Sequence, residues 1–256
     1  MKIAIFGDAI GRPGRKAVMS EIAALKDNID FFIVNGENAS GGIGLTPETA
    51  KEFFDNGVDI ITSGNHIWNK KEMVSSIDNF KTLLRPNNYP DAPGRGYCVV
   101  NKNGYRLGVL NLQGRTFMPP IDCPFKSADA ALSAIGSEAD AVIVDFHAEA
   151  TSEKVALGKY LDGRVAALVG THTHVQTSDE RILSNGTAYM TDLGMCGPMD
   201  SVIGMTYDAV IKKFLTALPV HFEIGKGDIS ICGAIIEINH STGKATNIER
   251  INKIYI

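Results

Sequence analysis

The feature that most constrains this chain is a repeated unit in which a short apolar run ends in a polar turn. Five such runs lie at residues 2–6, 31–34, 59–62, 141–146 and 165–169. Helical patterns follow or separate them at residues 14–26, 47–56, 68–77, 127–136, 152–161 and 205–217. Alternating strands and helices are typical of βα units around a mainly parallel sheet.

Two segments depart from this alternation. Residues 97–113 form two strand patterns around Asn103-Gly104, and residues 229–255 form two around residues 241–244. Both patterns indicate antiparallel hairpins. The chain therefore combines parallel and antiparallel parts, which predicts two packed sheets with helices outside. Its 256 residues, 44% of them apolar, suit one large domain or two small ones.

Composition excludes several classes of protein. Charged residues make up 21% of the chain and the net charge is -4, so a basic excess typical of duplex nucleic-acid binders is absent. The first apolar run stops at Phe6 and no apolar stretch reaches 18 residues, so we expect a cytoplasmic chain without a membrane segment. The four cysteines lie far apart without a CxxC pattern and predict neither a zinc knuckle nor a disulfide framework.

Polar side chains stand at the carboxyl ends of all five predicted strands, where ligands bind in open α/β sheets. Singly, each cluster is compatible with a turn, a cap or a solvated histidine. Together they hold four of the six histidines of the chain. Imidazole, carboxylate and amide oxygen suit zinc, manganese and iron. The sequence therefore predicts a metal cage built from Asp8, Glu37, Asn65, His147, His172 and His174.

Other histidine-rich hydrolases do not fit this spacing. A metallo-β-lactamase type of cage needs HxHxDH, but Val175-Gln176-Thr177 follows His174. Amidohydrolases normally carry HxH after the first strand, where this chain carries Gly7-Asp8, and HExxH is absent from the sequence.

The order Asp, acidic residue, Gly-Asn-His, His and His-x-His resembles the calcineurin-like metallophosphoesterases. Longer phrases are similar to the YmdB-like branch, whose members are 2′,3′-cyclic-nucleotide 2′-phosphodiesterases. They span nearly the whole chain, as GDAIGRPGR (7–15), NGENASGGIGLT (35–46), SGNHIW (63–68), NLQGRTFM (111–118), DFHAEATSEK (145–154), GTHTHVQTSD (170–179) and YMTDLGMCGPMDSVIG (189–204).

The chain departs from the broader superfamily at several positions. Ile10 stands where the usual Asp-x-His motif has its histidine, and Glu37 replaces the usual bridging aspartate. Ile67 replaces an acidic residue, and the last motif is GTHTH rather than GHxH. These departures argue against transfer from protein phosphatases and agree with the YmdB-like branch.

The resemblance implies a single domain over residues 1–256 with an α/β fold, a four-layer αββα sandwich of two mixed β-sheets flanked by helices. It implies two divalent or trivalent metal ions per subunit, iron or manganese with zinc as the alternative. The first metal would take Asp8, Glu37, Asn38 and His174. The second would take Glu37, Asn65, His147 and His172, so that Glu37 bridges the pair.

The implied reaction converts 2′,3′-cyclic nucleotides, or RNA ends bearing that group, to 3′-phosphates. A hydroxide bridging the metals would attack phosphorus, and His66 would protonate the departing sugar oxygen as general acid. Asp8 and Glu37 are the only charged ligands, so two divalent ions leave the site with a charge of about +2, or about +1 with hydroxide bound. That charge attracts a phosphodiester anion.

Several alternatives stay open at this stage. His66 is either the general acid or a residue that orients a ligand. Arg12 binds phosphate or forms a surface ion pair, and Trp68 stacks on a base or packs a helix. Segment 112–125 is a lid or a subunit contact in a homo-oligomer, a dimer or tetramer. The competing functions are a broad phosphodiesterase or nucleotidase, and a metal-loaded regulatory protein that acts through a partner.

Overall fold

The computed structural model describes residues 1–255, which form two mixed sheets. The first sheet has the order β2-β11-β12-β1-β3-β4, with β13 paired to β12. Its strands are β1 (Lys2–Phe6), β2 (Asp8–Ala9), β3 (Phe31–Asn35), β4 (Ile60–Thr62), β11 (Met195–Met205), β12 (Ile224–Ile238) and β13 (Ala245–Tyr255). The second sheet has the order β5-β6-β7-β8-β10-β9. Its strands are β5 (Tyr97–Lys102), β6 (Tyr105–Gln113), β7 (Ala141–His147), β8 (Ala167–Thr171), β9 (Arg181–Ile182) and β10 (Ala188–Met190).

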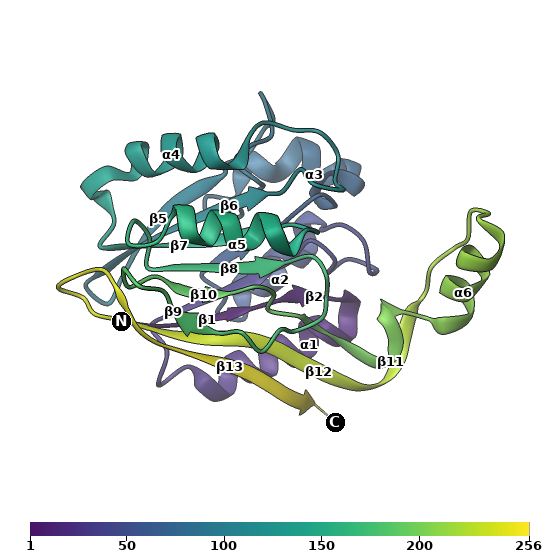
Figure 1. Ribbon diagram of the computed structural model, residues 1–256. Helices are drawn as coiled ribbons and strands as arrows, with labels where there is room; N and C mark the ends of the chain where they lie inside the picture. The colour runs from purple at the N-terminus through teal and green to yellow at the C-terminus, as the bar shows by residue number, and fades with distance from the viewer. Residues whose placement is uncertain (256) are drawn as a thin grey trace.

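Helices cover the outer faces of both sheets (Figure 1). The first sheet carries α1 (Gly11–Leu25), α2 (Pro47–Asp55) and α3 (Lys71–Ser76), with the 3₁₀ turns Ile67–Asn69 and Ile77–Asn79 on either side of α3. The second sheet carries α4 (Pro124–Ile135), the 3₁₀ turn Gly136–Glu138 and α5 (Thr151–Tyr160). All six predicted helices form, the last being α6 (Tyr207–Thr216), and their ends move by no more than three residues.

Three apolar clusters separate the layers. The first lies between the two sheets and includes Ile3 and Ile5 of β1, while the second packs Ala4 and Phe6 of the same strand against α1 and α2. The third packs the outer face of the second sheet against α4 and α5. Because β1 is buried on both faces, it has no polar alternation. Three cores between four layers confirm the predicted αββα sandwich with two mixed sheets.

The pairing of the strands agrees with the predicted hairpins and parallel units. β1, β3 and β4 run parallel, as do β6, β7 and β8, while β5–β6 and β12–β13 form the two antiparallel hairpins. The sequence patterns missed β11, which pairs with β12 through two register shifts. Gly197, Pro198 and Gly204 interrupt this strand, so it lacks a regular period.

An arm carrying α6 projects from the sandwich between β11 and β12 (Figure 1). Val210 is its one buried helical residue among those described, whereas Phe214 and Leu215 are each 81% exposed. Within residues 1–255, no helix combines the length and apolar character that crossing a bilayer requires.

Candidate metal centre

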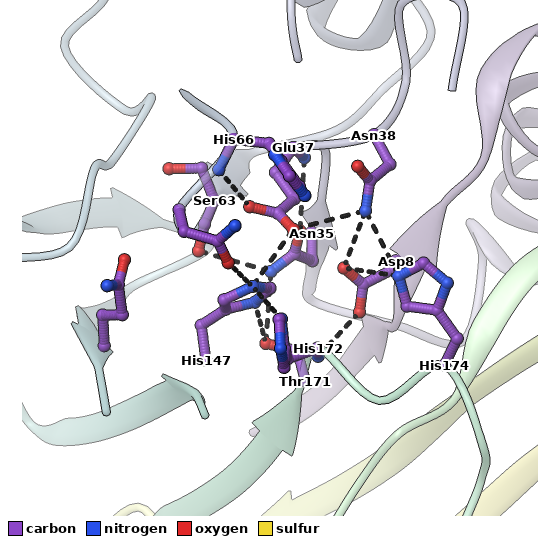
Figure 2. A network of polar contacts seen from close by, with 12 residues as sticks. Asp8, Asn35, Glu37, Asn38, Ser63, His66, His147, Thr171, His172 and His174 are labelled. Atoms are coloured by element: carbon purple, nitrogen blue, oxygen red, sulfur yellow. Dashed lines mark hydrogen bonds and ion pairs between the residues drawn. The ribbon is translucent and has the colours of Figure 1, made fainter. Parts of the chain in front are cut away.

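Carboxyl ends of strands from both sheets bring the predicted ligands into one cluster (Figure 2). Asp8 follows β1, the Glu37-Asn38 pair follows β3, and the Asn65-His66 pair follows β4. The second sheet supplies His147 at the end of β7 and the His172 to His174 turn after β8. Asp8, Glu37 and His147 are completely buried. The structure thus gathers residues that are up to 166 positions apart in the sequence.

Local backbone features make this convergence possible. A Cβ atom on Gly64 would overlap the imidazole of His147, so the Gly-Asn-His motif needs glycine for close packing rather than for a turn. His172 has φ +102° and His174 has φ +66°, both in the left-handed region that side chains disfavour. Such strain persists only where surrounding contacts hold it, and it is common at functional sites.

One half of the cluster is crowded around His147 Nε2. This atom lies 3.0 Å from Glu37 Oε1, 3.1 Å from Asn65 Oδ1 and 3.0 Å from His172 Nδ1. A ring nitrogen carries at most one hydrogen, which is too few to satisfy three facing acceptors. Ligand atoms of Glu37, His147 and His172 all lie within 4.8 Å of one another. This donor set fits a transition-metal ion, which all four lone pairs could share.

The other half centres on Asp8. Its Oδ1 lies 3.4 Å from Asn38 Nδ2 and 3.6 Å from His174 Nε2. Asn38 Nδ2 also lies 3.3 Å from Glu37 Oε1, so this amide directs its nitrogen at both carboxylates. Metal binding would use the carbonyl oxygen instead, which a half-turn about the Cβ–Cγ bond presents. With that rotation, this set also fits a metal ion.

The charges of the cluster suit cations. Burial disfavours ionisation, but His174 outweighs burial and holds the pKa of Asp8 below its usual range. The pKa of Glu37 is also lowered, because the effect of His147 exceeds that of burial. Burial and then His147 lower the pKa of His172 to about 3, so its imidazole is neutral at physiological pH. Burial opposes the protonation of His147 and His174, but Glu37 raises the pKa of His147 and Asp8 raises the pKa of His174. The cluster therefore presents two carboxylates, a neutral imidazole at His172 and two imidazoles whose protons a metal ion would displace.

Hydrogen bonds orient two of the histidines. Thr171 Oγ1 donates to Asp145 Oδ1 at 2.8 Å, so it accepts from His147 Nδ1 at 2.9 Å. His174 Nδ1 donates to the carbonyl of Ile203 at 2.9 Å. Each Nδ1 therefore carries the hydrogen and each Nε2 faces the cluster, as a metal ligand requires. No sequence motif indicated a role for Thr171 or Ile203.

Asp145 anchors a buried polar layer between the sheets. It accepts hydrogen bonds from Thr62, Thr171 and Asn35, which belong to three different strands. Burial raises its pKa to about 6. The signal in the sequence was a polar residue within an apolar strand, but that pattern does not reveal partners on other strands.

A buried ion pair braces the turn that carries His172 and His174. Lys154 of α5 lies 2.6 Å from Asp192 Oδ2 and also donates to the carbonyl of Thr171 at 2.9 Å. Asp192 accepts the backbone N–H of Thr173 at 3.2 Å. The two charged side chains are each 1% exposed. Nothing local in the sequence links two residues 38 positions apart.

The remaining predicted residues lie around the cluster. The backbone N–H of His66 donates to Glu37 Oε2 at 2.9 Å, and its ring Nδ1 lies 3.2 Å from Asn69 Oδ1. Trp68 packs edge-on against Tyr89 and borders the apolar core, which supports the packing interpretation. Arg12 is exposed and makes no side-chain hydrogen bond or ion pair to residues 1–255.

Segment 112–125 begins in β6 and crosses toward α4. The backbone N–H groups of Arg115 and Thr116 donate to Glu153 at 3.1 Å, so α5 holds the start of the loop. Phe117 is 89% exposed. The two predicted roles of this segment, a lid or a subunit contact, stay predictions.

Known proteins resemble this chain over nearly its full length. A family model described as YmdB-like protein matches residues 4–251. A 2′,3′-cyclic-nucleotide 2′-phosphodiesterase from Bacillus subtilis is 49% identical over 98% of this chain and 96% of its own length. A novel phosphatase from Mycoplasma pneumoniae superposes with a TM-score of 0.92 at 36% identity, over 99% of this chain and 93% of that one.

More distant structures share the fold. A 5′-nucleotidase precursor from Thermus thermophilus superposes with a TM-score of 0.59 at 12% identity, over 99% of this chain and 54% of that one. At this identity the likeness shows a shared fold. Because the family model covers nearly the whole chain and the relatives exceed 30% identity, this chain belongs to the YmdB-like family of metallophosphoesterases.

Proposed function

We propose that this chain is a dinuclear metal-dependent phosphodiesterase that hydrolyses 2′,3′-cyclic nucleotides, or RNA ends bearing that group, to 3′-phosphates. The observation that carries the proposal is the crowding at His147 Nε2, where three lone-pair atoms lie within 3.1 Å. The 49% identical B. subtilis enzyme supports the choice of substrate.

The residues divide into two ligand sets. Asp8, Asn38 and His174 would hold one ion, Asn65, His147 and His172 would hold the other, and Glu37 would touch both. Its Oε1 supports this role, because this oxygen lies 3.0 Å from His147 Nε2 in one set and 3.3 Å from Asn38 Nδ2 in the other. Bound metals would supply positive charge and activate water at neutral pH.

His66 has the placement of a general acid. It follows Asn65 directly, and Asn69 Oδ1 accepts from its Nδ1 at 3.2 Å, which leaves Nε2 to exchange a proton. In the proposed step, water adds its oxygen to phosphorus and the bond from phosphorus to O2′ breaks. His66 gives O2′ a proton, and the phosphate stays on O3′. The proton released by the attacking water restores the one that His66 has given up.

A substrate panel tests the proposal. Purified protein loaded with manganese, iron or zinc is assayed on 2′,3′-cyclic AMP, 3′,5′-cyclic AMP, bis-p-nitrophenyl phosphate and 5′-AMP, with products separated by chromatography. We expect the highest kcat/KM on 2′,3′-cyclic AMP, with 3′-AMP as product. Faster hydrolysis of monoesters, or release of 2′-AMP, would contradict it.

A complementation experiment separates a catalytic role from a regulatory role. A strain lacking this protein is complemented with the Glu37→Gln variant, which loses the predicted bridging carboxylate. We expect no rescue because the proposed function is hydrolysis. Full rescue by an inactive variant would favour a binding protein that acts through a partner.

A further inference from the structure

His172 has a partner on each of its two ring nitrogens. Nδ1 faces His147 Nε2 at 3.0 Å, inside the proposed metal cluster. Nε2 faces Glu149 Oε2 at 3.0 Å, on the other edge of the ring. Glu149 lies in the short loop between β7 and α5, two residues after His147.

The contact fixes where the ring carries its hydrogen. A carboxylate only accepts hydrogen bonds, so Nε2 must carry the hydrogen for the contact to form. A histidine that binds a metal ion is neutral and has only one ring hydrogen. Nδ1 is then left with a free lone pair, and that lone pair points at the cluster.

His172 differs from the other two histidines in this respect. His147 and His174 donate from Nδ1 and direct Nε2 toward the cluster. His172 instead directs Nδ1 toward the cluster. The single hydrogen of a neutral imidazole can sit on either ring nitrogen, so the hydrogen bond made by one nitrogen decides which nitrogen is free to bind a metal. An acceptor on the Nε2 side therefore favours Nδ1 as the ligand.

We propose that Glu149 is a positioning residue that locks His172 in the tautomer and orientation that bind the second metal. The inference rests on the proposed metal site. Glu149 itself is not placed as a ligand, because its oxygen contacts the ring nitrogen that faces away from the cluster and its side chain is 49% exposed. Partners of this kind raise metal affinity about 10–100-fold.

Metal binding tests the proposal without substrate. Metal-free wild type and Glu149→Ala are titrated with Zn²⁺ by calorimetry, and metal content is measured after dialysis. We expect wild type to retain two ions per chain and Glu149→Ala to bind the second about 10–100-fold more weakly, with the first unchanged. Equal affinity at both sites would overturn the proposal.

A conservative variant distinguishes the orientation of the His172 ring from the negative charge of Glu149 as the cause of the effect. Glu149→Gln removes the negative charge but keeps a carbonyl oxygen that can accept from Nε2. We expect it to restore most of the second-site affinity. If Glu149→Gln is as weak as Glu149→Ala, attraction by the charge explains the effect and the tautomer lock is wrong.

Nitrogen NMR reads the tautomer directly. In histidine-labelled, metal-free protein, the His172 signals are assigned by loss in His172→Gln. We expect the Nε2–H pattern in wild type and a mixture of tautomers in Glu149→Ala. An unchanged pattern in Glu149→Ala would refute the lock.

Two controls complete the design. Glu138→Ala removes an exposed carboxylate that has no polar side-chain partner within residues 1–255, and should leave metal binding unchanged. Wild type that binds two ions but does not hydrolyse 2′,3′-cyclic AMP would refute the proposed substrate while leaving the role of Glu149 intact. Loss of second-site binding in both Glu149 and Glu138 variants would indicate a non-specific effect and overturn the inference.

Discussion

The buried pair of Lys154 and Asp192 offers the sharpest test of how the histidine turn is held. Lys154→Met keeps the length and apolar stem of the side chain but removes its charge. Asp192 then stays 1% exposed without its ion-pair partner at 2.6 Å. Removing one member of a buried pair costs about 3–5 kcal/mol, because the remaining charge is uncompensated.

Two features of the site adjust this value in opposite directions. Asp192 keeps hydrogen bonds from the backbone N–H groups of Thr173 and Gly194, which lowers the cost. The carbonyl of Thr171 loses its bond to Lys154, which adds about 1 kcal/mol. We therefore expect the free energy of unfolding of Lys154→Met to fall by about 3–4 kcal/mol relative to wild type.

Urea denaturation followed by circular dichroism measures this change. The matched control is Arg164→Met, because Arg164 also lies 2.6 Å from a carboxylate, that of Asp129, but both side chains are 42% exposed. An exposed pair contributes about 0–1 kcal/mol. A loss below about 1 kcal/mol in Lys154→Met, or equal losses in both variants, would refute the reasoning that burial sets the cost.

Three further outcomes follow from the site and the arm. His66→Ala should retain both metals by elemental analysis but lose about 10²–10⁴-fold in kcat; a kcat near wild type would exclude the acid role. Burial opposes the charge of His174, yet Asp8 raises its pKa to about 9, so metal binding at pH 7 should release a proton from this ring and strengthen as pH rises to about 9. Calorimetry in buffers of different ionisation enthalpy checks this, and binding without proton release would contradict it. The expected homo-oligomer should lose mass in light scattering when Phe214 and Leu215, each 81% exposed, are changed to serine. An unchanged mass would exclude the arm from the assembly interface.

Much of the fold was readable from the sequence because its signals are local. Buried parallel strands are continuous apolar runs, and Asn103-Gly104 marks a hairpin without reference to the rest of the chain. The strand β11 was not predicted, because glycines and a proline interrupt it and its pairing with β12 shifts register twice. Its path depends on β12, which lies more than 20 residues downstream of its start.

The sequence indicated which residues gather in the cluster, but not the residues that hold them there. A proposed ligand such as Asn65 follows a strand and belongs to a recognisable motif, so its position along the chain indicates its place in the fold. Thr171, Lys154 and Glu149 act through contacts that form only when separate elements pack together. The same distinction explains Gly64, whose motif was visible but whose reason is the imidazole of His147 on the other sheet.

Three carboxylates around the cluster each make a different supporting contact. Asp145 accepts the hydrogen of Thr171, Asp192 accepts a backbone N–H of the histidine turn, and Glu149 contacts the outer edge of His172. None of these three is a proposed ligand. Only Asp8 and Glu37 would place negative charge directly on the metals, so two divalent ions keep a charge of about +2 for an anionic substrate.

That charge balance can be tested by adding a third carboxylate ligand. Asn65→Asp replaces the amide oxygen that lies 3.1 Å from His147 Nε2 with a charged one of nearly the same shape. We expect tighter binding of the second metal, since its ligand becomes anionic. We also expect a higher KM for the diester, because the positive charge that attracts it falls from about +2 to about +1. Zinc titration and steady-state kinetics give the two values, with Asn28→Asp as a control on an exposed residue away from the ligand set. If Asn65→Asp bound metal more tightly and also lowered KM, net charge would not govern how this site receives its substrate.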